Sequence, residues 1–200
     1  MIKNIIFDFG GVLLDWNPRY LYREYFHDDE KMEWFLANVC NGEWNIQQDA
    51  GRPFAEAVKL LQEKFPEWKE PIQMFDEYWY KMLKCELPES IDLLRELKGR
   101  SYGIYGLTNW SAEKIGYAFS HYDFFDQFDG IVVSGREKVA KPDPEIYRIL
   151  LDRYRLNPAE CVFIDDNQEN VDAALRLGIN AIRFDDITSV RARLERLLSE

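Results

Sequence analysis

The sequence predicts an α/β protein, a doubly wound parallel sheet with an inserted all-helical domain. Short apolar runs alternate with amphipathic segments in residues 88–200, a pattern typical of parallel strands joined by helices. A further apolar run, residues 2–7, stands at the N-terminus, and the long stretch that follows it has helical periodicity only. With 200 residues and 46% hydrophobic content, the chain can form one core and a smaller appended domain.

Five runs rich in apolar and β-branched residues are expected to be the strands. Each is short enough to be a buried strand and is bounded by polar residues or glycine. They cover residues 2–7, 102–107, 130–134, 161–164 and 181–184.

Capping residues mark the helices between these strands. Ser111 is expected to cap one helix, Asp143 with Pro144 begins another, and Gly178 ends a third. A C-terminal amphipathic segment, which contains Arg191, Arg193 and Arg196, is expected to pack on the sheet. The predicted helices are residues 111–121, 144–155, 167–177 and 190–198.

The stretch between the first two strands predicts an inserted helical domain. Apolar residues recur there at helical spacing, as in Met32, Phe35 and Val39. Asn17-Pro18 and Leu87-Pro88 are helix-start or linker signals and mark its borders. The predicted division is residues 1–15 and 88–200 for the sheet domain, and residues 16–87 for a helical cap that determines substrate specificity.

One segment of this insertion, residues 41–45, breaks the helical pattern. We expect it to be a loop that reaches the functional site and brings Trp44 to a substrate. Trp16 and Trp110 would flank the site from the sheet domain. Packing in the core is the alternative for these aromatic residues.

Composition and charge exclude several classes of function. The formal net charge of −11 disfavours a nucleic-acid partner, and no apolar segment is long enough for a membrane span or a signal peptide. Three scattered cysteines and two histidines indicate neither a disulfide framework nor a zinc site. We expect a soluble, cytoplasmic protein whose oligomeric state is open, a monomer being plausible.

Polar residues follow the predicted strands at the points where a doubly wound sheet binds ligands. Asp8 ends the first strand and precedes two glycines, and three later strands are followed by Thr108-Asn109, by Lys141 further along, and by Asp165-Asp166. Each signal has a simpler alternative: an ordinary turn for Thr108-Asn109, a solvated loop residue for Lys141, and a helix cap for Asp165-Asp166. Together they predict a phosphoryl-transfer site.

These four motifs resemble those of the haloacid dehalogenase superfamily over the whole chain. The motifs are Asp8 to Val12, Leu107-Thr108-Asn109, Lys141-Pro142 and Asp165-Asp166. The insertion after the first motif resembles the helical cap of the first type in that family. Within the superfamily the chain is most similar to small cytoplasmic sugar-phosphate phosphatases, including the glucose-1-phosphate phosphatase branch.

The resemblance implies a phosphatase that acts on a small phosphorylated metabolite, a sugar phosphate, through an aspartyl-phosphate on Asp8. It implies Mg²⁺ held by Asp8, the Gly10 carbonyl, Asp165 and Asp166. Lys141 would balance charge and Thr108 would bind the phosphoryl group, so that Asp8, Lys141 and Thr108 are the implied catalytic residues. Lys138 is a nearby competitor for the lysine role. The implied substrate-binding residues are Thr108, Asn109, Lys141, Gly11 and Trp44.

One departure from the family pattern concerns proton transfer. Phosphatases of this superfamily usually carry an acid/base Asp two residues after the nucleophile, where this chain has Gly10. Asp15 is one candidate to replace it, although a turn carboxylate is an equal alternative. The departure also suggests a phosphate-binding or regulatory module with impaired catalysis. Two other enzymatic activities stay open although Gly10 counts against them: a 2-haloacid dehalogenase, which usually has a side chain at this position, and a phosphomutase, which normally needs the missing acid/base group.

Overall fold

The computed structural model describes residues 1–199. Its main sheet has five parallel strands in the order β5-β4-β1-β6-β7, which confirms the predicted fold class. The observed ends differ from the predicted ones by at most two residues. The strands are β1 (Asn4–Phe7), β4 (Gly103–Thr108), β5 (Gly130–Val133), β6 (Cys161–Asp165) and β7 (Asn180–Arg183).

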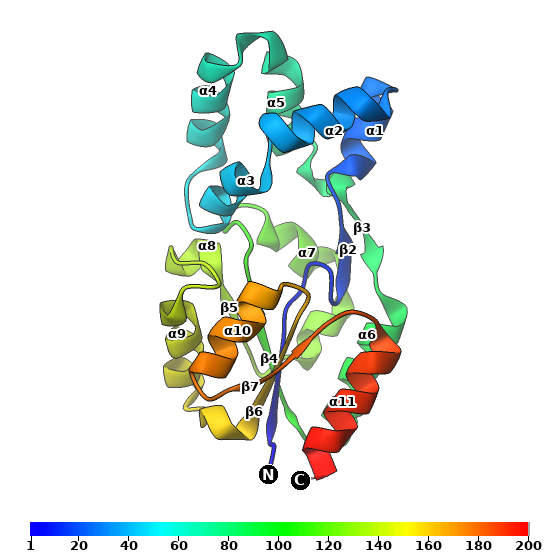
Figure 1. The fold of residues 1–200 in the computed structure, drawn as a ribbon, viewed down its shortest axis with the longest axis vertical. Coiled ribbons are helices and arrows are strands. Elements are labelled where there is room, and N and C mark those ends of the chain that lie inside the picture. The colour runs from blue at the N-terminus through cyan, green and yellow to red at the C-terminus, as the bar shows by residue number, and fades with distance from the viewer. Residues whose placement is uncertain (200) are drawn as a thin grey trace.

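Helices cover both faces of this sheet (Figure 1). On one face lie α9 (Pro144–Tyr154) and α10 (Gln168–Arg176), and on the other lie α6 (Pro88–Gly99) and α11 (Ile187–Ser199). The alternation of side chains along β1 explains both layers. Ile6 packs in the cluster under α9 and α10, whereas Ile5 and Phe7 belong to the other cluster, with residues of α6 and α11.

The predicted Asp143 cap is confirmed, the predicted Ser111 cap is wrong, and Asn167, predicted as the first residue of its helix, is a cap. The Asp143 side chain accepts a hydrogen bond from the Glu145 amide at 2.9 Å at the start of α9, and Asn167 caps α10 in the same way. The predicted Ser111 helix instead begins later, as α7 (Ile115–His121). Ser111 stabilises the preceding turn, where its hydroxyl accepts from the Glu113 amide at 3.2 Å.

The inserted helices gather beyond the carboxyl ends of the strands, at the top of Figure 1. We call α1 to α5 the helical cap. Between β1 and the helical cap runs β2, which pairs antiparallel with β3 on the return path. The prediction of helical periodicity only between the first two predicted strands is therefore wrong at the C-terminal end of that stretch. The elements are β2 (Leu14–Trp16), α1 (Arg19–Phe26), α2 (Asp29–Asn38), α3 (Gly42–Asp49), α4 (Phe54–Lys64), α5 (Lys69–Glu77) and β3 (Leu83–Glu86).

Short helices complete the chain. The four-residue helix α8 (Ser134–Glu137) follows β5. The 3₁₀ turns are η1 (Pro66–Trp68), η2 (Trp79–Met82), η3 (Asp123–Gln127) and η4 (Pro158–Glu160). No helix within residues 1–199 is both long and apolar enough to cross a membrane.

The segment predicted as a loop, residues 41–45, is the start of helix α3. The Asn41 side chain caps this helix by accepting from the Trp44 amide at 2.8 Å. Trp44 is buried inside the helical cap, with its ring 5.0 Å from that of Phe75 and 6.5 Å from that of Phe54. Trp44 therefore packs in a core, which was the alternative interpretation of the sequence.

The order of the strands reverses at β1, because the chain goes from β1 outward through β4 and β5, and then returns to β6 on the other side of β1. In such sheets ligands bind at this reversal, beyond the carboxyl ends of the strands. The ends of β1, β4 and β6 meet there and carry Asp8, Thr108 and Asp165.

Candidate active site

Asp8 is the first residue after β1 and lies at the centre of the site. It is buried, with 8% of its surface exposed, because β4 and β6 flank it on both sides. One carboxylate oxygen, Oδ1, accepts from the Phe9 amide at 2.7 Å and lies 2.8 Å from Lys141 Nζ. The other oxygen has no hydrogen bond within residues 1–199. Asp8 therefore has one oxygen available for a ligand.

Lys141 joins the two strand ends. Its ammonium is fully buried and lies 2.8 Å from Asp8 Oδ1, 2.6 Å from Asp165 Oδ2 and 2.9 Å from the Leu107 carbonyl oxygen. Burial alone would lower the pKa of Lys141, but the two carboxylates outweigh burial and raise it above its ordinary value. Lys141 is therefore a fixed positive charge beside the nucleophile candidate, as predicted from the sequence.

Asn109 holds the backbone of Lys141. Its side-chain amide donates to the Lys141 carbonyl at 2.9 Å and accepts from the Lys141 amide at 2.8 Å. These two bonds give Asn109 a positioning role. Its side-chain amide has a second N–H and Asn109 lines the cavity described below, so the predicted contact with a substrate stays a prediction. Lys138, the competitor for the lysine role, is exposed at the end of α8 and is not part of this cluster.

The two acidic residues that follow β6 have different environments. Asp165 is fully buried and accepts from Lys141, from the Asn167 amide at 2.8 Å and from the Asn170 side chain at 3.0 and 3.1 Å. Asp166 is exposed at the rim of the site. Its carboxyl group is nevertheless partly desolvated, and this desolvation, together with the charge of Asp165, raises the pKa of Asp166. Asp165 is therefore a structural anchor for Lys141, and Asp166 is free to bind a ligand.

The carboxylates of Asp8, Asp165 and Asp166 lie close enough to hold one metal ion, since one oxygen of each falls within 4.8 Å of the others. Burial raises the pKa of Asp8 to about 8. The charge of Lys141 lowers this pKa in part, and the charges of Asp165 and Asp166 raise it further. A divalent cation would relieve this repulsion, and a set of carboxylate oxygens is what Mg²⁺ prefers. The residues present therefore fit a magnesium site, for which Asp8 and Asp166 have carboxylate oxygens without a hydrogen bond inside residues 1–199, and the assignment of individual ligands stays a prediction. The role of the Gly10 carbonyl stays a prediction.

Gly11 makes this arrangement possible in a way that the sequence did not indicate. Its φ is +76°, and a Cβ added there would lie 2.5 Å from Asp166 Oδ2. Its amide already donates to the Leu14 carbonyl at 2.9 Å, so it is not available for a substrate as predicted. Gly11 instead provides the space in which Asp166 approaches Asp8.

Thr108 ends β4 beside this cluster. Its hydroxyl is buried and has no hydrogen-bond partner within the described chain. A buried hydroxyl without a partner costs free energy unless a ligand supplies one. This observation agrees with the predicted contact between Thr108 and a phosphoryl oxygen.

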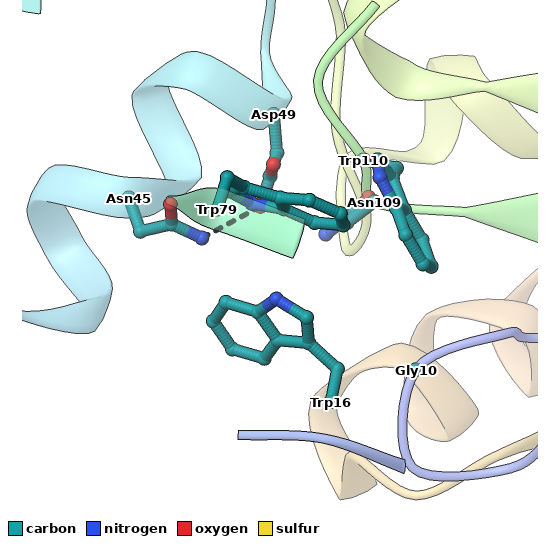
Figure 2. A pocket seen from close by; sticks show the side chains of 7 residues that line it. All are labelled: Gly10, Trp16, Asn45, Asp49, Trp79, Asn109 and Trp110. Atoms are coloured by element: carbon teal, nitrogen blue, oxygen red, sulfur yellow. Dashed lines mark hydrogen bonds between the residues drawn. The ribbon is translucent and has the colours of Figure 1, made fainter. Parts of the chain in front are cut away.

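A cavity of about 80 Å³ lies between the sheet domain and the helical cap (Figure 2). This volume is several times the ~10–15 Å³ that one water needs. Three indoles dominate the lining. Trp79 and Trp110 pack with ring centroids 5.4 Å apart, and Trp16 stands opposite Trp79. The described lining residues are Gly10, Trp16, Asn45, Asp49, Trp79, Asn109 and Trp110.

Sequence reasoning missed Asp49 and Trp79 as cavity residues, whereas Asn45 belongs to the segment 41–45 that was predicted to reach the site. Asn45 and Asp49 are four positions apart and share one side of α3, but this signal depends on recognising residues 42–49 as a helix. Asp15, the residue considered for proton transfer, is not among the lining residues. Its carboxylate accepts the Tyr20 hydroxyl at 2.7 Å.

Comparison with known proteins gives the family. The family model for haloacid dehalogenase-like hydrolases matches residues 2–178. A sesquiterpene phosphatase of Aspergillus oryzae is 30% identical over 98% of this chain and 96% of its own length. A phosphorylated carbohydrates phosphatase of Thermotoga maritima is 24% identical over 90% of this chain and 84% of its own.

A similar solved structure is a family enzyme of Bacteroides thetaiotaomicron in complex with magnesium and inorganic phosphate. It is 25% identical, with a TM-score of 0.71, and the match covers 95% of this chain and 99% of that one. Fold, site and comparisons together define a hydrolase with a Rossmann-like sheet and an acidic cluster at its switch point. The chain belongs to the haloacid dehalogenase-like hydrolases.

Proposed function

We propose that this protein is a Mg²⁺-dependent phosphatase that hydrolyses a small phosphomonoester through an aspartyl-phosphate on Asp8. The observation that carries the proposal is the charge arrangement around Lys141. One buried ammonium joins two carboxylates, and a third carboxylate lies within reach of a shared cation. Such a site attracts a dianionic phosphoryl group and a divalent cation together.

Each residue of the site has a definite task in this reaction. Asp8 attacks phosphorus with the carboxylate oxygen that Lys141 and the Phe9 amide leave free. Bound Mg²⁺ would supply the positive charge that keeps Asp8 ionised near an anionic substrate. Lys141, held by Asn109 and Asp165, keeps its charge at a fixed position, and the unpaired Thr108 hydroxyl donates to a phosphoryl oxygen.

The cavity supports a sugar as the alcohol part of the substrate. The indole nitrogens of Trp16 and Trp110 and Oδ1 of Asn45 are buried without hydrogen-bond partners inside residues 1–199. A polyhydroxylated ligand pairs such atoms, and its ring can pack on indole faces, whereas a hydrocarbon leaves the donors unpaired. We therefore prefer a sugar phosphate to an isoprenoid phosphate, although one relative is a sesquiterpene phosphatase.

A 2-haloacid dehalogenase is the rival activity on the same nucleophile. It needs no metal, so the cluster would hold three carboxylates against the single ammonium of Lys141. Without a cation, Lys141 compensates the buried Asp8 and Asp165, and Asp166 is left without a counter-charge beside them. The position of Asp166 therefore favours the phosphatase.

The test is release of inorganic phosphate from p-nitrophenyl phosphate and a panel of sugar phosphates, with Mg²⁺ and with EDTA. We expect turnover that needs both Mg²⁺ and Asp8, and none for Asp8→Asn. The same protein is incubated with 2-chloropropionate and assayed for chloride. Chloride release without metal, in the absence of phosphate release, would replace the proposal with the dehalogenase.

A further inference from the structure

Asp49 is the one titratable side chain among the described residues that line the cavity. The other six are a glycine, two asparagines and three tryptophans, none of which exchanges a proton near neutral pH. Loss of an alcohol from a phosphate ester leaves a basic alkoxide that needs a proton. Asp49 is therefore the residue to examine as the proton donor.

Two hydrogen bonds fix Asp49. It ends helix α3, and its backbone carbonyl accepts from the hydroxyl of Ser134, whose oxygen in turn accepts from the Trp110 amide at 2.9 Å. Its carboxylate Oδ2 accepts from the Asn45 side chain at 3.1 Å. The Ser134 bond joins the helical cap to the sheet domain at this point, and the Asn45 bond orients the carboxylate within α3, so Asp49 has a defined position over the site.

Gly10 lines the opposite side of the same cavity, so the substrate lies between Asp49 and the nucleophile loop (Figure 2). A Cβ added to Gly10 would meet nothing within 4 Å. The space beside the nucleophile that a side chain could occupy is thus open, and Asp49 faces it from the helical cap.

The electrostatics of Asp49 suit proton transfer. Burial raises its pKa to about 7, while the Ser111 backbone amide and the charge of Lys141 lower it in part. A group with a pKa near the working pH can both give and accept a proton. No other charged group contributes to this balance within residues 1–199.

We propose that Asp49 is the general acid and base of this enzyme, supplied by the helical cap at a site where the nucleophile loop has only Gly10. The inference rests on the proposed phosphatase function. As the bond from Asp8 to phosphorus forms and the ester P–O bond breaks, protonated Asp49 gives its proton to the leaving oxygen. Water then attacks the aspartyl-phosphate, Asp49 takes one proton from that water, and inorganic phosphate and free Asp8 result.

The test compares two substrates of similar aromatic shape, p-nitrophenyl phosphate and benzyl phosphate, which differ in the basicity of the leaving oxygen. Nitrophenolate leaves without a proton, whereas benzyl alkoxide needs one. The quantity measured is kcat/KM, which covers the steps up to departure of the alcohol. The variants are Asp49→Asn, which keeps the shape and can keep the Asn45 contact, and Glu43→Gln, which removes the same charge from an exposed position of α3.

We expect Asp49→Asn to lower kcat/KM for benzyl phosphate by about 10²- to 10⁴-fold and for p-nitrophenyl phosphate by less than about tenfold. Glu43→Gln should have the same kcat/KM as the wild type with both substrates. Retained activity on p-nitrophenyl phosphate shows that the variant is folded.

An equal loss with both substrates would overturn the inference, because it would indicate a structural role. A wild type that hydrolyses p-nitrophenyl phosphate but not benzyl phosphate would also overturn it. A wild type that releases phosphate from neither would instead refute the proposed function itself.

Discussion

Replacing Asp49 by Asn should make the protein more stable at pH 8, and this prediction does not depend on any activity. Burial raises the pKa of Asp49 to about 7 from an ordinary value of 3.8. The folded state therefore binds more protons than the unfolded state between about pH 4 and pH 7, and the stability of the wild type falls through this window. The amide side chain of the variant cannot ionise, so the variant does not lose this stability as the pH rises.

The size of the effect follows from the pKa difference. Each pKa unit is worth about 1.4 kcal/mol, so the full difference would be about 4 kcal/mol. Asp49 is only half-buried, and solvent screening reduces the expected gain to about 1–2 kcal/mol. For a chain of this length that is a rise of about 2–8 °C in Tm.

The assay is thermal unfolding of wild type, Asp49→Asn and Glu43→Gln in EDTA at pH 4.5 and pH 8. The difference between Asp49→Asn and wild type should be small at pH 4.5 and positive at pH 8. Glu43 is exposed, so its variant should follow the wild type at both values. A Tm difference for Asp49→Asn that does not change with pH would refute the reasoning.

Three more predictions concern the acidic cluster. Gly11→Ala should lower the free energy of unfolding by about 1–2 kcal/mol, because residue 11 has a positive φ, and it should displace Asp166. Gly10→Ala should stay within about 0.5 kcal/mol of the wild type. Equal urea midpoints for the two variants would contradict this prediction. Lys141→Met should lower the free energy of unfolding by about 3–5 kcal/mol at pH 8, because two buried carboxylates lose their counter-charge. The loss should be smaller at pH 5, where Asp8 is protonated. A loss that does not vary with pH would argue against this cause. Mg²⁺ should raise Tm more at pH 8 than at pH 6, since Asp8, with its pKa raised to about 8, must lose a proton to bind the ion; an equal rise at both would mean that Asp8 is not a ligand.

The sequence was sufficient for the sheet and for the residues at its strand ends. Buried parallel strands have continuous apolar runs, as residues 161–164 show, and the carboxyl ends of such strands meet at one edge. This is why Asp8, Thr108 and Asp165 could be placed together before the fold was known.

The residues that line the cavity could be predicted from the sequence only in part. Its walls come from segments far apart in the chain, such as Trp16, Asp49 and Trp110, which meet only when the helical cap rests on the sheet domain. The local pattern of apolar and polar residues does not indicate how the two domains pack against each other. The short strand Leu83–Glu86 has two exposed residues and lacks a buried apolar run, so it gave no strand signal.

The roles of Asn109 and Gly11 could also be identified only from the structure. The motif shows that an amide follows Thr108, but only the structure shows that this amide holds the Lys141 backbone through two hydrogen bonds. Similarly, a Gly-Gly pair indicates a turn, and the 2.5 Å approach of Asp166 is what distinguishes Gly11 from Gly10.

The central claim is that Asp8 carries the phosphoryl group, and mass spectrometry of the acid-quenched reaction tests it most directly. Wild-type protein is mixed with p-nitrophenyl phosphate and Mg²⁺, quenched within the first turnover and digested. We predict a phosphoryl group on the peptide that contains Asp8, absent from Asp8→Asn and from the reaction in EDTA. Phosphate release by the wild type with no phosphoryl group on that peptide would contradict the account.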